Sequence, residues 1–394
     1  MLEMADPATP RAFLRVGATT IARQQLALAL ALRCERIVCI ARGMRPELIE
    51  LQHEAEANGA QFNVIPGPRS LLGLITATDE LIVVSDGLFV STAEAADLLG
   101  KGEAVLIQPV DQGLAAGFER IDLNNAAAGA MRIPGRLVDG IADLPADCDA
   151  TSALQRLALQ ANVRQRPIPA ADSGSLFWTL VRDDAEAHDL EPLWIHHRTR
   201  DDQPPNLSRA IALLVVRRFG PGILHAGSGA AHLAIGAAIL AAIAIGLGWF
   251  GFFAAGLVVC ALGWITREIA GLLARVEAGP APVRQGLLEQ VAAYGWMIDA
   301  VIIGLVAFGS PGHVWQPVPD RLFPPFMLVA LLRILPNAVH GRWTAWLGDR
   351  ALLALALASA VAGGAGSYVT HAGAVVAALA GIALPGLTKR LTRP

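Results

Sequence analysis

The chain has 394 residues, and its 31 basic and 34 acidic side chains leave a formal charge of -3. Hydrophobic residues make up 54% and charged residues 16%, whereas a typical soluble domain carries about 25% charged residues. This composition excludes a disordered chain and an ordinary soluble enzyme, and the near-neutral charge excludes nucleic-acid binding through a broad basic surface. The cysteines have neither metal-site nor disulfide-framework spacing: Cys34, Cys39, Cys148 and Cys260.

The first half of the chain, residues 1–200, has strand patterns that alternate with helix patterns. We predict helices over 20–32, 45–58 and 92–99, and strands over 36–41, 61–65, 80–85 and 104–107. This alternation is typical of a mostly parallel sheet covered by helices, in which ligands bind at the carboxyl ends of strands. Asp86 follows one of these strands and precedes Gly87, so it is a candidate to hold a cation or a ribose. The alternative is an aspartate that merely ends the strand in a turn.

Two segments of this half resemble the sugar-phosphate nucleotidyltransferases, over roughly residues 10–165. They are residues 10–21 (PRAFLRVGATTI) and the VVSDG segment that contains Asp86. The resemblance implies an α/β nucleotidyltransferase-like domain, with Arg11 in the place of a lysine and Asp86 in the place of a metal-binding aspartate. The family's first strand and glycine-rich loop have no counterpart before Pro10. Either the domain has lost catalysis or the true start lies upstream of Met1, and CTP with Mg²⁺ or Mn²⁺ is expected only if the nucleotide site is retained.

The second half of the chain, from about residue 222, is a series of apolar runs. We predict six membrane spans, a number that the lengths of the runs favour over a soluble helical core. The runs cover 232–247, 249–265, 291–308, 322–335, 352–365 and 372–384. Residues 201–221 are expected to form either an interfacial amphipathic helix or a linker, between a domain over 1–200 and a membrane domain over 222–394.

Arginines are concentrated in alternate connections between these runs, which predicts an orientation. The positive-inside rule places both termini in the cytoplasm, so we expect a multi-pass protein of the inner (cytoplasmic) membrane. The arginines and the lysine that carry this prediction are Arg209, Arg217, Arg218, Arg267, Arg275, Arg284, Arg333, Arg342, Arg350, Lys389, Arg390 and Arg393.

The segment REIAGLLAR, from Arg267 to Arg275, resembles the signature DxxDGxxARx8GxxxDxxxD of the CDP-alcohol phosphatidyltransferases. Gly271, Ala274 and Arg275 match the signature. The resemblance implies an all-α domain with six spans, and the order of the two halves resembles that of a bifunctional fusion that makes and then consumes a CDP-alcohol. In the family, four aspartates of the signature hold two divalent metals against a diphosphate.

All four aspartate positions of that signature hold other residues in this chain. Arg267, Ala270, Gln290 and Tyr294 occupy them, so no metal is expected here. Two interpretations stay open for the arginines of this region, which are Arg267, Arg275 and Arg284. They bind a phosphate in place of the metals, or they anchor the helices at the cytoplasmic surface. Asp299 lies inside the third run, where it needs a cationic partner, and Arg267 and Arg333 are the candidates.

Three functions remain open at this stage. The first is a catalytically degenerate relative, linked to phospholipid or glycolipid biosynthesis, that binds lipid phosphate or a partner protein. The second is an active transferase that moves a phospho-alcohol from a CDP-alcohol to a hydroxyl acceptor and releases CMP. The third is a small transporter. We expect membrane lipid as a partner, no nucleic acid, and a homodimer formed through the membrane domain, as the family resemblance implies.

Overall fold

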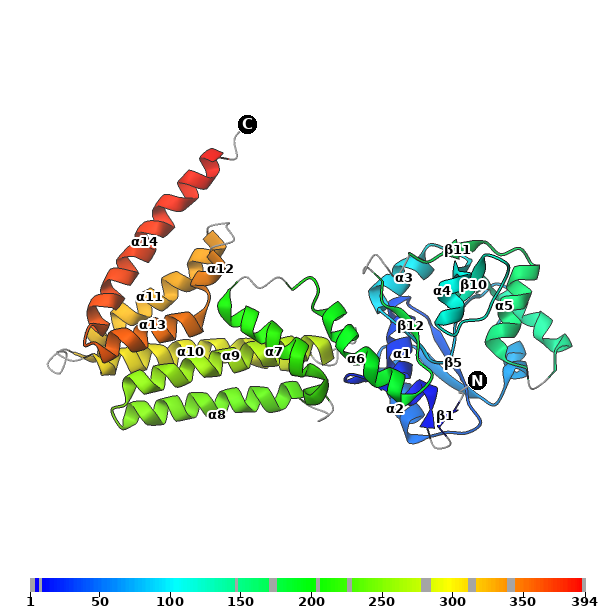
Figure 1. The fold of residues 1–394 in the computed structure, drawn as a ribbon, viewed down its shortest axis with the longest axis horizontal. Helices are drawn as coiled ribbons and strands as arrows, with labels where there is room; N and C mark the ends of the chain where they lie inside the picture. Colours follow the sequence, from blue (N-terminus) through cyan, green and yellow to red (C-terminus); the bar gives the residue numbers. More distant parts are fainter. Residues whose placement is uncertain are drawn as a thin grey trace. The chain divides into compact units, whose positions relative to one another are not determined.

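The computed structural model describes residues 4–6, 9–145, 148–169, 176–202, 206–224, 229–277, 285–310, 317–338 and 344–391. The chain forms two compact units, of which the first runs to His197 and the second begins at Arg198 (Figure 1). The segment expected as an interfacial helix or linker is mostly helical, because it contains helix α7 (Leu207–Leu224) of the second unit.

The first unit is an α/β unit, and the helices and strands predicted between residues 20 and 107 are present within one or two residues of the expected bounds. Its helices are η1 (Arg11–Phe13), α1 (Ile21–Ala31), α2 (Pro46–Ala57), η2 (Pro68–Gly73), α3 (Thr92–Gly100), α4 (Val110–Ala115), η3 (Gly135–Asp143), α5 (Ala150–Gln160) and α6 (Asp184–Arg198). Its strands are β1 (Met4–Asp6), β2 (Thr9–Pro10), β3 (Arg15–Val16), β4 (Thr19–Thr20), β5 (Arg36–Ile40), β6 (Gln61–Ile65), β7 (Glu80–Val84), β8 (Leu88–Val90), β9 (Ala104–Pro109), β10 (Asn125–Pro134), β11 (Gln165–Pro167) and β12 (Trp178–Leu180).

The prediction of a mostly parallel sheet is wrong, because the largest sheet is mixed. Its strand order is β11-β9-β10-β7, and β10 runs antiparallel to both of its neighbours. Parallel pairing is limited to β9 with β11 and to β5 with β6, which form a separate two-stranded sheet. The reason is the ten-residue strand β10, whose sequence NAAAGAMRIP carries few of the β-branched and aromatic residues that mark a strand. It returns antiparallel beside β9 after a connection over residues 110–124 that contains α4.

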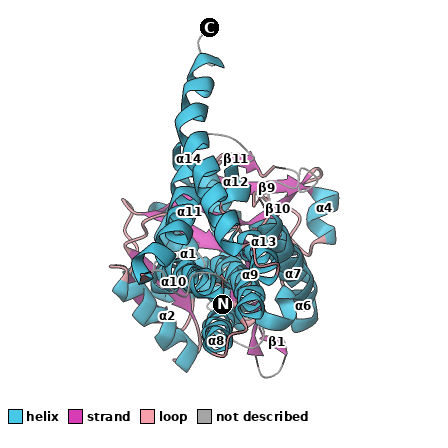
Figure 2. Cartoon of the chain, turned by 90° about the vertical axis from the view of Figure 1, so that its left-hand side faces the viewer, coloured by secondary structure: helices cyan, strands magenta, loops and turns pink. Residues whose placement is uncertain are grey.

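The second unit is helical throughout its described residues, and the described strands all belong to the first unit. Figure 2 shows the helices of the chain in cyan and its strands in magenta. Besides α7, its helices are α8 (Gly229–Trp249), α9 (Phe253–Glu277), α10 (Gln285–Gly309), α11 (Val318–Ala338), α12 (Thr344–Leu347), α13 (Arg350–Ala362) and α14 (Gly366–Leu391). Every apolar run of the sequence therefore contributes to a helix. A buried cluster from α8, α9, α10, α11 and α13 forms the core of this unit.

Helices α8 and α9 lie side by side, and small residues allow their close approach (Figure 1). Ala237, Ala241 and Ala244 on α8 are buried, and a Cβ at Gly256 on α9 would lie 2.9 Å from the carbonyl oxygen of Ala244. The opposite face of α8 is apolar but exposed, with Ile235 59% exposed. Small residues at the packing face and large apolar residues outside are typical of helices that contact lipid.

The prediction of six spans is not met, because three of the described helices have the length and composition to cross a membrane. These are Gly229–Trp249, Phe253–Glu277 and the Gly366–Ala383 part of α14. Helix α13 has 13 residues, which at about 1.5 Å per residue cover roughly 20 Å of a hydrocarbon core that is about 30 Å thick. Helix α11 contains three prolines besides Asp320, Arg321 and Arg333. The described apolar part of α10, Ala293–Gly309, is also short.

Helix α7 presents the amphipathic face that its sequence predicts. Leu207, Ile211 and Leu214 are exposed along one side, while the other side packs into the second unit. The start of the helix is held by Asp349, whose carboxylate accepts hydrogen bonds from the Ser208 backbone N–H at 2.9 Å and from its Oγ at 2.5 Å. The exposed leucine and isoleucine side chains are those that an interfacial helix would place in the acyl boundary.

Candidate functional site

The second unit contains a buried carboxylate that two arginines share. Asp299 on α10 is 5% exposed and accepts from Arg333 Nη1 on α11 at 2.6 Å and from Arg350 Nε at 2.7 Å. Arg350 opens α13 and is itself 4% exposed. An ion pair removed from water is stable only when its hydrogen bonds are well made, which both of these are. Of the two partners considered for Asp299, the structure brings Arg333 to it, and it adds Arg350.

Two guanidinium groups converge on Gly295, one turn before Asp299 on α10. The Nη2 atoms of Arg267 and Arg333 each lie 3.8 Å from the point where a Cβ of Gly295 would be. The two nitrogens are therefore at most twice that distance apart. Each arginine directs its Nη1 toward a carboxylate, Glu268 for Arg267 and Asp299 for Arg333, and its Nη2 toward Gly295. We call this space the Gly295 niche.

A tryptophan ring lies next to each guanidinium group. Arg267 Cζ lies 4.7 Å from the ring centroid of Trp264, and Arg333 Cζ lies 3.4 Å from that of Trp296. A guanidinium that stacks on an aromatic face keeps its N–H groups in the ring-parallel plane, where they can donate to an anion. The Gly295 niche is thus lined by oriented donors on two sides and by an apolar ring edge, since Trp264 also lies 3.8 Å from the Cβ position.

Further ion pairs connect this niche to the other end of α9. Arg209 on α7 donates to Glu268 at 3.1 Å and to Asp202 at 3.0 Å, and Asp202 also accepts from Arg275 at 3.1 Å. With the pairs described above, three carboxylates are each shared by two arginines. The members of this network are Asp202, Glu268, Asp299, Arg209, Arg267, Arg275, Arg333 and Arg350. Among the described residues, the network contains five arginines and three carboxylates.

The other candidate residues of the segment that resembles the signature do not line the Gly295 niche where the structure describes them. Arg275 lies two turns beyond Arg267, where it pairs with Asp202 and not at the Gly295 niche. Ala274 is 1% exposed and packs in the core, and the Gly271 carbonyl accepts a long, 3.5 Å hydrogen bond from Arg275 Nε. Arg284 lies outside the described residues. The structure therefore assembles Arg267 with Arg333, which the signature does not contain.

Sequence patterns do not single out the residues that shape the niche. Gly295, Trp264 and Trp296 are not among the candidate residues that the sequence offers. Arg350 reads as a cytoplasmic flank of a span, although it is almost fully buried against Asp299. The sequence does contain one signal for Arg350. Asp299 is a charged residue inside an apolar run and must have a cationic partner, and any arginine that the fold brings close can be that partner.

The first unit contains a cavity of about 660 Å³, and one of its two predicted site residues, Asp86, lines it. Asp86 lies at the carboxyl end of β7, as expected, and lines this cavity. It precedes Gly87, which has a φ of +79° and lies where a Cβ would be 2.5 Å from the Val181 carbonyl oxygen. Gln25 on α1 holds the turn by donating to the carbonyls of Ser85 and Leu88 at 3.0 and 2.9 Å.

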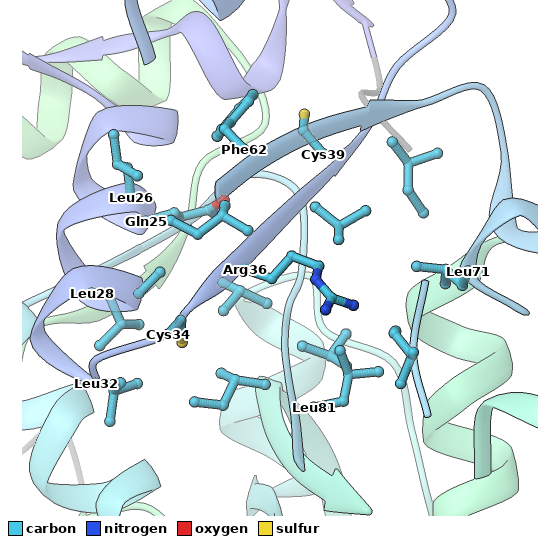
Figure 3. Close-up of a pocket in the computed structure, with 18 of the residues that line it drawn as sticks. Gln25, Leu26, Leu28, Leu32, Cys34, Arg36, Cys39, Phe62, Leu71 and Leu81 are labelled. Atoms are coloured by element: carbon cyan, nitrogen blue, oxygen red, sulfur yellow. The ribbon is translucent and has the colours of Figure 1, made fainter. Parts of the chain in front are cut away.

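Figure 3 shows the cavity with leucines of α1 on one side, Leu71 on the other, and Arg36 of β5 between them. Arg11 lies in η1 and is half-buried, and it does not line the cavity. Among the described residues, no three His, Cys, Asp or Glu side chains come together as a metal site.

The fold and the site define a two-unit protein with an α/β unit and a helical unit, in which three helices could cross a membrane and arginines converge on the Gly295 niche. No known family model matches the chain. The chain is similar to 4-hydroxy-tetrahydrodipicolinate reductase from Methanospirillum hungatei JF-1, with 30% identity over 110 residues. The match covers 26% of this chain and 43% of the reductase, so the chain spans less than half the length of this relative.

Proposed function

We propose that this chain is an integral membrane protein that binds the phosphate of a lipid headgroup at the Gly295 niche. Its architecture resembles that of the CDP-alcohol phosphatidyltransferases, and we place it among their catalytically degenerate relatives, in phospholipid or glycolipid biosynthesis. The observation that carries the proposal is the convergence of Arg267 Nη2 and Arg333 Nη2 on one point, 3.8 Å from each.

Phosphate is the anion that suits this geometry best. Its oxygens lie on different sides of one phosphorus atom, so a single group can accept from two guanidiniums that face one another. A phosphate ester also leaves its organic part outside the niche, where the exposed apolar faces of the neighbouring helices would meet acyl chains. The stacking tryptophans support the proposal because they fix both guanidiniums before the ligand arrives, which lowers the entropic cost of binding.

The test is a thermal-unfolding titration of the detergent-purified full chain with short-chain phosphatidic acid, short-chain phosphatidylcholine or inorganic phosphate. A ligand that binds the folded state alone must raise the unfolding midpoint. We expect phosphatidic acid to raise it more than phosphatidylcholine does, and Arg267→Gln and Arg333→Gln each to weaken the affinity about 10- to 100-fold, because each removes a charge-assisted hydrogen bond.

The matched control is Arg218→Gln, which removes an exposed arginine of α7 outside the network and should leave the affinity unchanged. Inorganic phosphate separates a lipid site from a site for free phosphate, because a lipid site should take phosphatidic acid more tightly. Equal midpoint shifts with all three ligands, or wild-type affinity in both glutamine variants, would contradict the proposal.

A further inference from the structure

Arg350 lies at a position that is unfavourable for an arginine. It is the first residue of α13 and is 4% exposed. The N-terminus of a helix repels a cation, and burial removes the water that would solvate the guanidinium. The helix does not need this side chain, because Asp349 caps α13 by accepting from the backbone N–H groups of Ala351 and Leu352 at 3.1 and 3.3 Å. The reason for an arginine here must therefore lie in what its side chain contacts.

Those contacts lead toward the Gly295 niche. Arg350 Nε donates to Asp299 Oδ1 at 2.7 Å, and Arg350 Nη1 donates to the Leu347 carbonyl oxygen at 3.1 Å. The second carboxylate oxygen, Asp299 Oδ2, accepts from Arg333 Nη1 at 2.6 Å. None of the three atoms nearest the Cβ position of Gly295 belongs to Arg350. Arg350 is thus connected to the niche through Asp299 and Arg333.

Sharing the carboxylate decides how Arg333 binds it. A carboxylate and a guanidinium that meet alone commonly form two parallel hydrogen bonds, one to each oxygen. In the structure, Oδ1 of Asp299 accepts from Arg350, and Arg333 donates to Oδ2 through Nη1. Its Nη2 is directed elsewhere, to a point 3.8 Å from the Cβ position of Gly295.

The other arginine of the niche meets its carboxylate in the same way. Glu268 Oε1 accepts from Arg267 Nη1, and Glu268 Oε2 accepts from Arg209 Nη1 at 3.1 Å. Here too a second arginine, which comes from another helix, takes the other oxygen of the carboxylate. A carboxylate divided between two arginines is therefore a feature of both sides of the niche.

We propose that Arg350 is a positioning residue of the anion site. By occupying Asp299 Oδ1, it keeps Arg333 from pairing with both carboxylate oxygens, and so it keeps Arg333 Nη2 directed at the niche. The inference rests on the proposed function, because the role of Arg350 is to prepare the site for phosphate. Without Arg350, Oδ1 is open to Arg333, whose guanidinium turns and donates to the carboxylate through both Nη atoms. A bound phosphate then loses one charge-assisted hydrogen bond.

Two substitutions of equal length separate this role from the charge and the packing of Arg350. In Arg350→Gln, the amide nitrogen is as many bonds from Cα as Nε is, so a donor to Asp299 Oδ1 is kept while the charge is lost. In Arg350→Met, a methyl group has that place, and no donor is left. Both variants lose the hydrogen bond to Leu347. Arg350→Leu is a second donor-free variant, which carries the test if the methionine variant does not fold.

The full chain of each variant is titrated in detergent with short-chain phosphatidic acid. Its midpoint shift is measured from its own ligand-free midpoint, so that lower stability does not count as lost affinity. We expect Arg350→Met to bind the lipid about 10- to 100-fold more weakly than the wild type, as expected for Arg333→Gln, and Arg350→Gln to bind it about as tightly as the wild type. Equal losses in the glutamine and donor-free variants would assign the effect to charge or packing and overturn the proposal.

Failure of the proposed function gives a different result. If the wild type shows no midpoint shift with phosphatidic acid, or if Arg333→Gln binds the lipid as tightly as the wild type, the niche is not a phosphate site and the role of Arg350 is refuted with it. If Arg333→Gln weakens binding but the donor-free variants keep the wild-type affinity, the phosphate site stands and the role of Arg350 alone is refuted.

Discussion

Gly295→Ala is predicted to make the second unit more stable and to weaken anion binding at the same time. The added Cβ would lie 3.8 Å from Arg267 Nη2, Arg333 Nη2 and Trp264, which are ordinary van der Waals distances, so the helix need not move. The methyl group nevertheless takes the point on which both guanidiniums converge. A substitution that fits the protein but fills the niche separates a binding role for Gly295 from a packing role.

The two effects have different sizes. Alanine is favoured over glycine inside a helix by about 0.8–1.0 kcal/mol, and a change of that size moves the unfolding midpoint of a unit this large by roughly 2–4 °C. The methyl group would fill space beside both Nη2 atoms, so a bound phosphate would have to give up its hydrogen bond to one of them. Loss of one charge-assisted hydrogen bond, worth about 1.5–3 kcal/mol, weakens the affinity by roughly 10- to 100-fold.

The assay is thermal unfolding of the full chain in detergent, with and without short-chain phosphatidic acid. Gly304→Ala is the matched control, because Gly304 lies on the same helix and a Cβ there meets nothing within 4 Å. This control should gain similar stability and keep the wild-type affinity. If Gly295→Ala kept the wild-type affinity as well, the Gly295 niche would not be the binding site, and the reasoning from converging guanidiniums would be refuted.

Three further predictions concern single groups. Asp299→Asn should lower the free energy of unfolding by about 3–5 kcal/mol, because it leaves the 4%-exposed Arg350 without its carboxylate. The double variant Asp299→Asn/Arg350→Met should recover part of the lost free energy of unfolding, because it removes the unpaired arginine as well. If chemical denaturation showed that the double variant loses the sum of the two single losses, the two residues would not be energetically coupled. Gly87→Ala should lower the free energy of unfolding more than Gly102→Ala does. Both glycines have a positive φ, but a Cβ at position 87 would lie 2.5 Å from a carbonyl oxygen, whereas a Cβ at position 102 would meet nothing within 4 Å. Equal urea midpoints for the two would refute this. Burial raises the pKa of Cys39 to about 11 from an ordinary 9.0, so its thiolate is about 100-fold scarcer at neutral pH. Its alkylation by iodoacetamide, with Cys39→Ser as blank, should therefore quicken about tenfold per unit between pH 8 and 10, and a rate that levels off near pH 9 would contradict it.

Local patterns along the chain predict most of the helices and strands. The strands at 36–40, 61–65 and 80–84 are short apolar runs bounded by turn residues, and α1, α2 and α3 lie where helical periodicity is expected. The pairing of strands is not a local property, so the mixed sheet was not predictable in the same way. Strand β10 decides it, and its alanines and Gly129 carry almost no strand propensity; tertiary packing between β7 and β9 makes it a strand.

Hydropathy similarly predicts where the membrane-like helices are but not how many can span a bilayer. Each of the six apolar runs has most of its residues in a helix, because a long apolar segment satisfies its backbone most easily in that form. Spanning additionally requires length without interruption. Helix α13 ends after 13 residues, and α11 carries three prolines, so a count of apolar runs overestimates the number of spans.

The Gly295 niche lay beyond sequence reasoning because its members belong to three different helices. A motif-based comparison groups Arg267 with Arg275, which share α9, whereas the structure separates them and joins Arg267 with Arg333 of α11. The residue that makes this possible is the one without a side chain, since Gly295 on α10 leaves the space between the two guanidiniums. Charge inside an apolar segment indicates that a site exists, but the choice among the arginines follows from the packing of α9, α10 and α11. The convergence of these two arginines on Gly295 is the observation on which the proposed phosphate site rests.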